Sequence, residues 1–283
     1  LVRNMVELGF SEQDEARWKS ISAQPHGIIL VTGPTGSGKT TTLYSTLKQL
    51  ATPEVNVCTI EDPIEMVEPA FNQMQVHQAI DLGFAEGVRA LMRQDPDIIM
   101  VGEIRDLETT EMAIQAALTG HLVLSTLHTN DAPSAITRLL DLGAPAYLLN
   151  ATLLGIMAQR LVRILCPHCK EAHPMTPEEE AIWDHLVRPW KAARPAGVYR
   201  AVGCIECRMT GYMGRIGLYE ILLMSPELRK VVSGEIDLAR VRDLAVREGM
   251  KPLRLSGALK VAAGVTTLAE VVKVAPPAEH EGR

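Results

Sequence analysis

Eight consecutive residues have the types and spacing needed to hold a phosphate chain. They read Gly33-Pro34-Thr35-Gly36-Ser37-Gly38-Lys39-Thr40, which fits the pattern Gly-x4-Gly-Lys-Ser/Thr between an apolar run and a helical stretch. The glycines let the backbone wrap around phosphate oxygens, and the following helix adds the positive end of its dipole. We expect Lys39 to reach the β- and γ-phosphates and Thr40 to bind Mg²⁺. A glycine-rich turn with a coincidental lysine is the alternative, and the strand–helix setting disfavours it.

Acidic side chains follow two other apolar runs, at the points where strands would end. Glu61 and Glu65 come after Val55–Ile60. Glu103 comes after Ile98–Val101 and one glycine. Nucleotide hydrolysis needs one carboxylate to position water and another, directly or through water, to hold the metal. The second run resembles a Walker B strand, but the glycine replaces the usual metal-holding Asp, so Glu103 is left with the metal or water role. Ordinary strand-end carboxylates are the alternative, most of all for Glu65.

One histidine and three arginines lie near these carboxylates or near a strand end. His128 stands just beyond the apolar run Leu122–Thr126, where it could sense a γ-phosphate, although a structural histidine fits that position equally well. The arginines close to Glu103 could contact phosphates across a subunit interface, as an arginine finger does. Surface ion pairs are the commoner role for such side chains. The three are Arg89, Arg93 and Arg105.

Four of the five cysteines form two Cys-x2-Cys pairs with 34 residues between them, namely Cys166 with Cys169 and Cys204 with Cys207. Each pair offers two thiolates on one tight turn, and two such turns complete a tetrahedral shell for Zn²⁺. The spacer exceeds the ~15–20 residues of common zinc ribbons. A helix at Thr176–Leu186 accounts for the excess. A closed Cys₄ site has no open position for substrate, so the metal is expected to be structural. Free or redox-active pairs are the alternative.

The elements that must position these residues alternate along the chain. From Gly27 to about Leu165, short apolar runs alternate with amphipathic helical stretches, which is typical of an α/β fold with a mainly parallel sheet. The strands are apolar on all sides and so are expected to be covered by helices on both faces. The expected strands are Gly27–Thr32, Val55–Ile60, Ile98–Val101 and Leu122–Thr126, and the expected helices are Lys39–Ala51, Ala85–Arg93, Leu107–Leu118 and one between Asp131 and Gly143.

The composition and the hydrophobic pattern of the chain change after Arg163. Cys166–Cys207 holds four cysteines, five prolines and little strand signal, and the chain from Ser225 onward reads as short helices. Capping residues open these helices, including a capping box at Thr267–Glu270. We therefore expect a linker remnant at 1–20, a RecA-like P-loop NTPase core at 21–163, a Cys₄ subdomain at 164–220 and a helical C-terminal subdomain with a frayed tail at 221–283.

Composition excludes several classes of protein. The 283 residues carry a net charge of −6 and are 47% hydrophobic and 22% charged, values of an ordinary globular chain. Nucleic-acid binders usually have a basic excess, which this chain lacks. No apolar run approaches the ~18 residues that span a bilayer, and nothing at the start resembles a signal peptide. We expect a chain that works in a reducing compartment and does not insert into a membrane itself.

Four stretches together resemble the secretion ATPase family, the hexameric motors of type II secretion and type IV pilus assembly. They are Gly33–Thr41, Thr59–Glu65, Arg89–Asp106 and Thr119–Asn130, of which the third is the most specific. In that family the second stretch is the Asp box, and the last falls in the His box. The resemblance implies Glu61, Glu65, Glu103, His121 and His128 as catalytic residues. It implies Gly33–Thr41 and Arg105 as nucleotide contacts.

The resemblance also implies cofactors, partners and a location. ATP and Mg²⁺ would occupy the phosphate loop, and Zn²⁺ would be structural. The partners would be five further copies in a homohexamer, an inner-membrane platform protein and a recruiting protein of the cytoplasmic membrane, with no nucleic acid. The protein would be cytoplasmic and peripheral to the inner membrane. Family members carry N-terminal domains that supply arginines to the nucleotide, and only Leu1–Ser20 of that connection is present. We therefore expect this chain to bind nucleotide and hydrolyse it poorly.

Two alternatives share the nucleotide loop. A pilus retraction motor has the same chemistry, but retraction motors of the family usually lack the metal-bearing subdomain. They also carry an Ala-Ile-Arg-Asn-Leu-Ile-Arg-Glu-like stretch that this chain does not contain. A zinc-ribbon nucleic-acid-dependent ATPase would need basic residues with interleaved aromatics in Cys166–Cys207, where the basic residues are scattered and the aromatics few. The sequence therefore favours a secretion or pilus-assembly motor.

Overall fold

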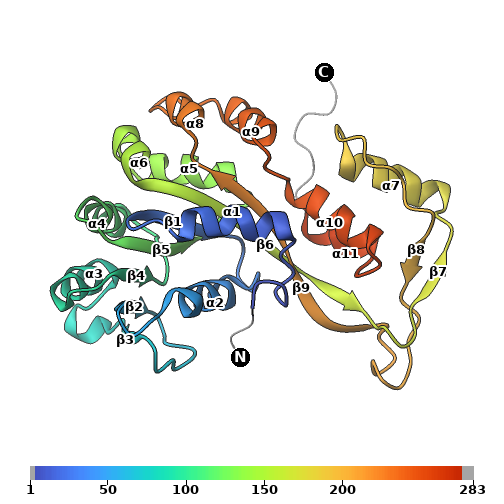
Figure 1. The fold of residues 1–283 in the computed structure, drawn as a ribbon, viewed down its shortest axis with the longest axis horizontal. Helices are drawn as coiled ribbons and strands as arrows, with labels where there is room; N and C mark the ends of the chain where they lie inside the picture. The colour runs from blue at the N-terminus through green and yellow to red at the C-terminus, as the bar shows by residue number, and fades with distance from the viewer. Residues whose placement is uncertain (1–3, 276–283) are drawn as a thin grey trace.

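The computed structural model describes residues 4–275 and has a seven-stranded sheet at its centre (Figure 1). The strands lie in the order β3-β2-β4-β5-β1-β6-β9, and every neighbouring pair is parallel except β6 and β9. The predicted α/β fold with a mainly parallel sheet is confirmed. The strands are β1 (Gly27–Thr32), β2 (Val57–Glu61), β3 (Asn72–Gln75), β4 (Ile98–Val101), β5 (Leu122–Leu127), β6 (Leu153–Leu165) and β9 (Tyr212–Leu223).

Helices cover both faces of this sheet. Successive side chains of a strand point to opposite faces, so Leu30 of β1 packs into one core and Val31 into the other. One face is covered by α1 (Glu12–Ser22) and α2 (Lys39–Leu50). The other is covered by α3 (Phe84–Leu91), α4 (Leu107–Leu118), α5 (Ala132–Asp141), α6 (Ala146–Thr152), α8 (Pro226–Val231) and α9 (Leu238–Arg247), with 3-10 turns η1 (Gln78–Ile80) and η2 (Met92–Gln94) beside α3.

The first described residues belong to the core. Met5, Phe10 and Trp18 are buried against α2 and β9, and the Trp18 indole N–H donates to the hydroxyl of Thr46 at 2.9 Å. Phe10 meets the ring of Tyr219 edge-on, with centroids 4.1 Å apart. Of the segment predicted as a linker remnant, 1–20, the described residues 4–20 therefore pack on the sheet, and their apolar side chains complete one of its faces.

Strands β6 and β9 form a long antiparallel hairpin that extends beyond the rest of the sheet. The expected boundaries after Arg163 and Glu220 fall inside these two strands, so neither boundary separates two folding units. The segment between the strands, residues 166–211, is here named the tetracysteine lobe. It contains β7 (Glu171–His173), α7 (Pro177–Val187) and β8 (Val198–Arg200), and β7 pairs antiparallel with β8.

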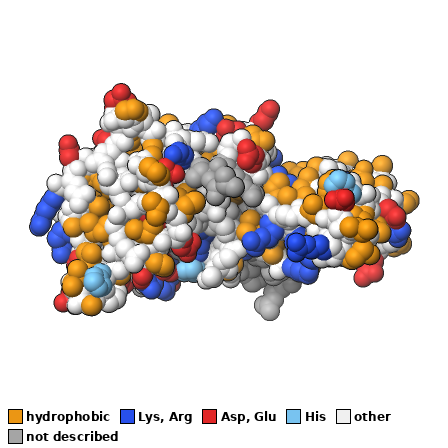
Figure 2. Space-filling view, turned by 90° about the horizontal axis from the view of Figure 1, so that it is seen from below, with side chains coloured by type: hydrophobic (Ala, Val, Ile, Leu, Met, Phe, Trp, Pro, Cys, Tyr) orange, Lys and Arg blue, Asp and Glu red, His pale blue; other side chains and the backbone are white. Residues whose placement is uncertain are grey.

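The tetracysteine lobe projects from one end of the molecule. Seen from below it is the narrower part on the right, and hydrophobic side chains gather on its surface (Figure 2). Its helix α7 packs against α10 (Leu253–Ala262) and α11 (Leu268–Val274) around a small core that includes Trp183, Leu255 and Val271. The predicted capping box at Thr176 is present: the Thr176 hydroxyl accepts from the Glu179 N–H, and the Glu179 carboxylate accepts from the Thr176 N–H. The lobe thus has a core of its own, continuous with the C-terminal helices.

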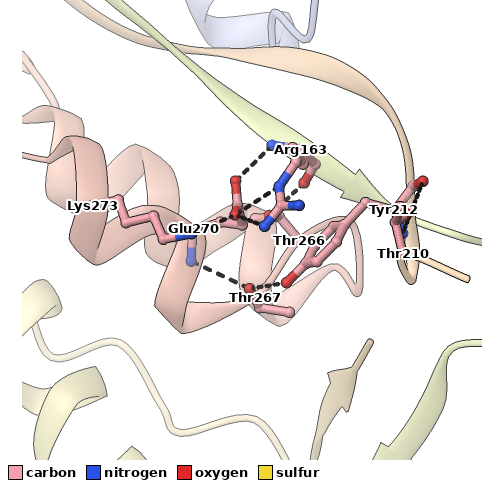
Figure 3. A network of polar contacts seen from close by, with 7 residues as sticks. All are labelled: Arg163, Thr210, Tyr212, Thr266, Thr267, Glu270 and Lys273. Atoms are coloured by element: carbon pink, nitrogen blue, oxygen red, sulfur yellow. Dashed lines mark hydrogen bonds and ion pairs between the residues drawn. The ribbon is translucent and has the colours of Figure 1, made fainter. Parts of the chain in front are cut away.

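A polar network ties α11 to the hairpin where it leaves the sheet (Figure 3). Arg163 of β6 donates through Nη2 and Nε to Glu270 at 2.7 and 3.0 Å, and its guanidinium stacks over the ring of Tyr212, 4.0 Å from the centroid. Thr267 caps α11 by accepting from the Glu270 N–H at 3.2 Å. The predicted capping box forms in this direction alone, because the Glu270 carboxylate is taken by Arg163.

The predicted strands and helices have close to their predicted bounds, but β6 and β9, the two longest strands of the sheet, were not predicted. Strand β3 was not predicted, because Asn72–Gln75 is short, polar and half exposed. The predicted frayed tail beyond Ala275 lies outside the described residues. No helix within residues 4–275 combines the length and apolar character needed to cross a membrane.

Candidate nucleotide site and candidate metal centre

Five neighbouring strands bring the candidate residues to one edge of the sheet. The phosphate loop joins the end of β1 to α2, and the pairing of Thr32 with Leu127 and with Ala158 places the end of β5 and the middle of β6 on either side. Glu61 ends β2, and β4 lies between β2 and β5. Because the carboxyl ends of parallel strands share an edge, the loop, the acids and His128 converge there.

The phosphate loop fits the group it was predicted to hold. Gly38 is the N-cap of α2 with φ of 88°, a conformation that favours glycine, and within the described chain no side chain caps this helix. By contrast, Asp106 caps α4 and Asp131 caps α5. The Ser37 hydroxyl is buried and has no hydrogen-bond partner among the described residues. Uncapped helix N–H groups and an unpaired hydroxyl are the donors that a phosphate accepts from.

Lys39 is held by backbone carbonyl groups at the ends of two strands. Its ammonium donates to the carbonyl oxygens of Gly33 and Leu127 at 2.6 and 3.2 Å and to Nδ1 of His128 at 3.0 Å. Burial lowers the pKa of Lys39 to about 8, partly opposed by the negative charge of Glu103. An ammonium desolvated in this way interacts strongly with an anion that reaches it.

His128 connects the lysine to the second predicted carboxylate. Its Nε2 lies 2.6 Å from Oε1 of Glu103. An ammonium can only donate, so Nδ1 of His128 accepts from Lys39 and the ring proton is on Nε2, directed at Glu103. The three side chains therefore form one hydrogen-bonded chain from the phosphate loop to the end of β4.

A small acidic cavity lies next to Thr40. Its volume is about 80 Å³, and Thr40, Glu61, Glu65 and Glu103 are among the residues that line it. Hydroxyl and carboxylate oxygens are the ligands that Mg²⁺ prefers. The donor set therefore fits the predicted metal. The two main carboxylates differ in setting, because Glu61 is 4% exposed whereas the Glu103 side chain is 23% exposed.

Arg105 lies at the rim of this cavity, as a predicted nucleotide contact could. Its guanidinium is 3.5 Å from Glu103 and 3.8 Å from Asp62, and it lies over the ring of Phe84, 5.2 Å from the centroid. The side chain is 54% exposed. Arg89 and Arg93 are exposed on α3 and η2 and do not join this cluster.

The four predicted metal-ligating cysteines converge at the tip of the β6–β9 hairpin. All four sulfurs lie within 4.8 Å of one another, with Cys166–Cys204 and Cys169–Cys207 at 3.8 Å and Cys204–Cys207 at 3.7 Å. A tetrahedron with metal–sulfur bonds of about 2.3 Å has edges of about 3.8 Å. The fifth cysteine, Cys58, is buried in the core.

Backbone donors prepare this centre for a cation. The N–H groups of Cys204 and Gly211 each donate to the sulfur of Cys207 at 3.2 Å. Desolvation raises the pKa of the Cys207 thiol, but these donors outweigh it and lower the pKa to about 6. A thiolate is the form of cysteine that binds a metal. The sulfur distances therefore fit a tetrahedral metal ion, while the pKa shifts of two neighbouring thiols go in opposite directions, since desolvation raises the pKa of Cys169 to about 11.

Residues 1–273 match the family described as Type II/IV secretion system protein. The chain belongs to this family. It is 62% identical over 276 residues to the type IV pilus assembly ATPase TfpB of Acinetobacter baylyi, which covers 98% of this chain and 47% of that protein. It is 46% identical over 271 residues to the type II secretion system ATPase E of Vibrio cholerae, which covers 96% of this chain and 53% of that protein.

A solved relative supports the same fold. The pilus retraction motor PilT with bound ADP superposes with a TM-score of 0.71 and 28% identity, covering 99% of this chain and 68% of that one. The resemblance inferred from the four motifs is confirmed at the level of the family. The chain spans about half the length of the curated relatives it matches.

In this member of the secretion-system family, one predicted site residue is not brought to the loop. His121 precedes β5, and β5 runs toward the loop for six residues, so His121 lies about 20 Å away at the opposite edge of the sheet. Its Nδ1 lies 2.8 Å from the carbonyl oxygen of Ala116 near the end of α4. Within one chain His121 therefore makes a local contact and is not brought to the loop, and its catalytic role stays a prediction.

Two residues next to the loop were not predicted. Gln159 of β6 accepts from the Thr42 hydroxyl at 2.7 Å, just behind the loop. Arg160 is buried and donates to the carbonyl oxygens of Asn130 and Gln159. Desolvation lowers its pKa, and the charges of Glu220 and Asp131 oppose this. The available signal was a Gln-Arg pair inside an otherwise apolar strand, because such residues are seldom buried without partners.

Proposed function

We propose that the protein is an ATPase motor subunit that binds and hydrolyses Mg-ATP to power type II protein secretion or type IV pilus assembly. One observation carries the proposal: the hydrogen-bonded chain from Lys39 through His128 to Glu103 beside the phosphate loop. The family supports it, because relatives with the names of ATPases from both machines match over nearly the whole chain. The activity assigned here is that of the full-length protein.

The residues divide the chemistry between them. The loop N–H groups and the Ser37 hydroxyl bind the phosphates, and Lys39 exchanges its carbonyl partners for phosphate oxygens. His128 keeps its Nε2–H on Glu103 and so orients this carboxylate beside the γ-phosphate. Glu103, the more exposed carboxylate, positions and deprotonates the attacking water. Arg105 balances charge at the rim of the site.

The remaining acids suit the metal. Thr40 would hold Mg²⁺ directly, and Glu61 and Glu65 would support it through water, because Glu61 is buried and already bonded on both oxygens. When bound, the metal neutralises the charge that develops on the β- and γ-phosphates. This assigns Glu103 to water and Glu61 to the metal, a division left open by the sequence.

The tetracysteine centre is proposed to hold structural Zn²⁺. Four thiolates leave no open coordination position, so the ion would stabilise the tip of the lobe and take no part in hydrolysis. Within the family resemblance, this centre favours an assembly or secretion motor over a retraction motor.

The partners follow from the same proposal. Six copies would form a ring in the cytoplasm, held at the inner membrane by a platform protein and a recruiting protein. The alternative, a nucleic-acid-dependent ATPase, predicts that added DNA or RNA stimulates hydrolysis. Such binding would need a basic surface with aromatic side chains. We expect no stimulation.

The decisive experiment measures phosphate release from Mg-ATP by the full-length protein and its Glu103→Gln variant. We expect the variant to bind nucleotide as before and to lose turnover by about 10²–10⁴-fold, the usual contribution of a general base. Glu108→Gln, on the exposed surface of α4, is the control and keeps the turnover of the native protein. Retained turnover in Glu103→Gln would remove Glu103 from the mechanism, and no release by the native protein would overturn the ATPase proposal.

A further inference from the structure

Three side chains on one face of α2 reach the segment that follows β2. Thr40, Tyr44 and Lys48 are four residues apart and therefore lie one above another along the helix. Thr40 lines the acidic cavity, Tyr44 contacts Glu61, and Lys48 pairs with Glu68 at 2.6 Å. The helix that begins at the phosphate loop is thus joined to the acidic segment at Tyr44 and at Lys48, and its first turn faces the cavity through Thr40.

The middle level holds Glu61 by both oxygens. The Tyr44 hydroxyl donates to Oε1 at 2.5 Å, and the Thr59 hydroxyl donates to Oε2 at 2.7 Å. Thr59 is two residues before Glu61 on β2, so both point to the same face of the sheet. The carboxylate of Glu61 is therefore fixed in orientation as well as buried.

Gln73 of the neighbouring strand β3 orients the tyrosine. Its Nε2 is 2.8 Å from the Tyr44 hydroxyl oxygen, 2.8 Å from the carbonyl oxygen of Met66 and 3.3 Å from Glu61 Oε2. A tyrosine hydroxyl that accepts from this amide has one proton left to donate, and the shortest contact directs it to the charged oxygen.

The tyrosine keeps its proton at every working pH. Burial raises the pKa of Tyr44 far above its ordinary value, and the hydrogen bond and charge of Glu61 raise it further. Tyr44 is completely buried, and its ring packs edge-on against Phe71 with centroids 5.4 Å apart. The hydroxyl therefore keeps its single proton and donates it to Glu61 while it accepts from Gln73.

We propose that Tyr44 is a positioning residue for Glu61. Through its hydroxyl, the helix that carries Thr40 fixes Glu61 at the acidic cavity, so that phosphate loop and carboxylate form one rigid unit. The inference rests on the proposed ATPase function. Outer partners that orient a metal-supporting side chain typically contribute 10–100-fold to metal affinity or activity.

The test compares two buried tyrosine hydroxyls in the full-length protein. Tyr44→Phe keeps the ring and removes the donor, and Tyr219→Phe does the same at a site where the hydroxyl donates to the carbonyl oxygen of Leu8 at 2.7 Å. Phosphate release is measured against ATP at saturating Mg²⁺ and against Mg²⁺ at saturating ATP. We expect Tyr44→Phe to lower kcat by about 10–100-fold and raise the half-saturating Mg²⁺ concentration, with KM for ATP unchanged. Tyr219→Phe leaves all three unchanged.

A second variant keeps the inference testable if Tyr44→Phe does not fold. Gln73→Met removes the donor that orients Tyr44 and is expected to lower kcat in the same direction by a smaller factor. Native kcat in a folded Tyr44→Phe or Gln73→Met protein overturns the inference, as does an equal loss in Tyr219→Phe. Absence of phosphate release from the native protein is a different result, since it refutes the ATPase proposal rather than the role of Tyr44.

Discussion

At the phosphate loop, five strands of one sheet set the positions of the candidate side chains. At the tetracysteine centre, two turns carry the four thiols, and only the three-residue strands β7 and β8 pair within the lobe beside them. The first site forms many of its polar contacts from within the chain: Lys39 bonds two carbonyl oxygens and His128, and Glu61 bonds two hydroxyls. The second offers mainly sulfurs that face one another.

The difference shows where each site obtains its rigidity. A parallel sheet buried on both faces is stable by itself and can hold donors and acceptors ready for a ligand. Two short strands are marginal without further support, and a metal that binds only the folded state supplies it. The nucleotide site should therefore be folded in the absence of nucleotide. The turns that carry the four cysteines should be unfolded in the absence of a metal ion.

The largest effect is expected from breaking the metal centre. Structural zinc centres contribute roughly 10–16 kcal/mol of apparent binding free energy to folding in small domains. We expect Cys204→Ser to abolish stoichiometric zinc and to remove hydrogen-exchange protection from residues 164–175 and 198–211. Protection of the core around Trp183 should remain, because α7 packs on α10 and α11. The measurements are metal content by mass spectrometry and hydrogen exchange.

Cys58→Ala is the matched control for that variant. Cys58 is buried in the main sheet and lies apart from the four clustered sulfurs, so zinc content should stay at one ion per chain. Nucleotide affinity should be unchanged in Cys204→Ser. Full protection of the tip after zinc loss would contradict the contrast drawn between the two regions.

The next largest effect is expected at the phosphate loop. Lys39→Ala removes a charge-assisted donor to the β- and γ-phosphates, and removal of one such donor typically lowers turnover about 10²–10³-fold. The Lys39→Ala protein should fold like the native protein, because the nucleotide site does not depend on bound nucleotide for its structure. Its zinc content should also be unchanged. Turnover and calorimetric binding of a slowly hydrolysed ATP analogue measure this. Binding equal to that of the native protein would show that Lys39 keeps its carbonyl partners when nucleotide is present.

The sequence predicted the phosphate loop and the four cysteines because each is a short motif whose chemistry depends on local spacing. The carboxylates and His128 were predicted from their places after apolar runs together with the family resemblance. The sequence did not predict Tyr44, Gln73 or Arg160 as site residues, because their roles depend on which strands become neighbours. Gln73 reaches Glu61 only because β3 pairs with β2, and no local pattern in Asn72–Gln75 indicates a strand.

The same reasoning explains why His121 lies away from the loop and why two predicted boundaries fall inside strands. His121 and His128 are seven residues apart, but a six-residue strand between them separates them to opposite edges of the sheet. The boundaries after Arg163 and Glu220 followed a change in composition, whereas β6 and β9 pair through that change. The composition of a segment indicates only its local environment. Which strands pair is decided by segments that are distant in the sequence, and composition does not indicate them.

The smallest effect concerns a buried acid of the main sheet that contacts two helices. Glu220 of β9 accepts from the N–H groups of Ala132 and Leu253 at 2.8 and 3.1 Å, so it binds the first residues of α5 and α10. Burial raises its pKa from 4.5 to about 7, with a further contribution from the charge of Asp131. Between these values the folded chain retains a proton that the unfolded chain releases, so this group makes the protein less stable as pH rises through that window.

Glu220→Gln should therefore remove the decrease in the free energy of unfolding between pH 4.5 and pH 7. It should leave the rest of the pH dependence of stability unchanged. The raised pKa corresponds to a loss of about 3 kcal/mol between pH 4.5 and pH 7, with no further change above. Urea unfolding of the native protein and the variant across this range measures the difference in slope. Glu227→Gln, an exposed acid of α8, is the control and should retain the native slope. An unchanged slope in Glu220→Gln would mean that Glu220 is ionised in the folded state, with its two helix N-termini sufficient to stabilise the charge.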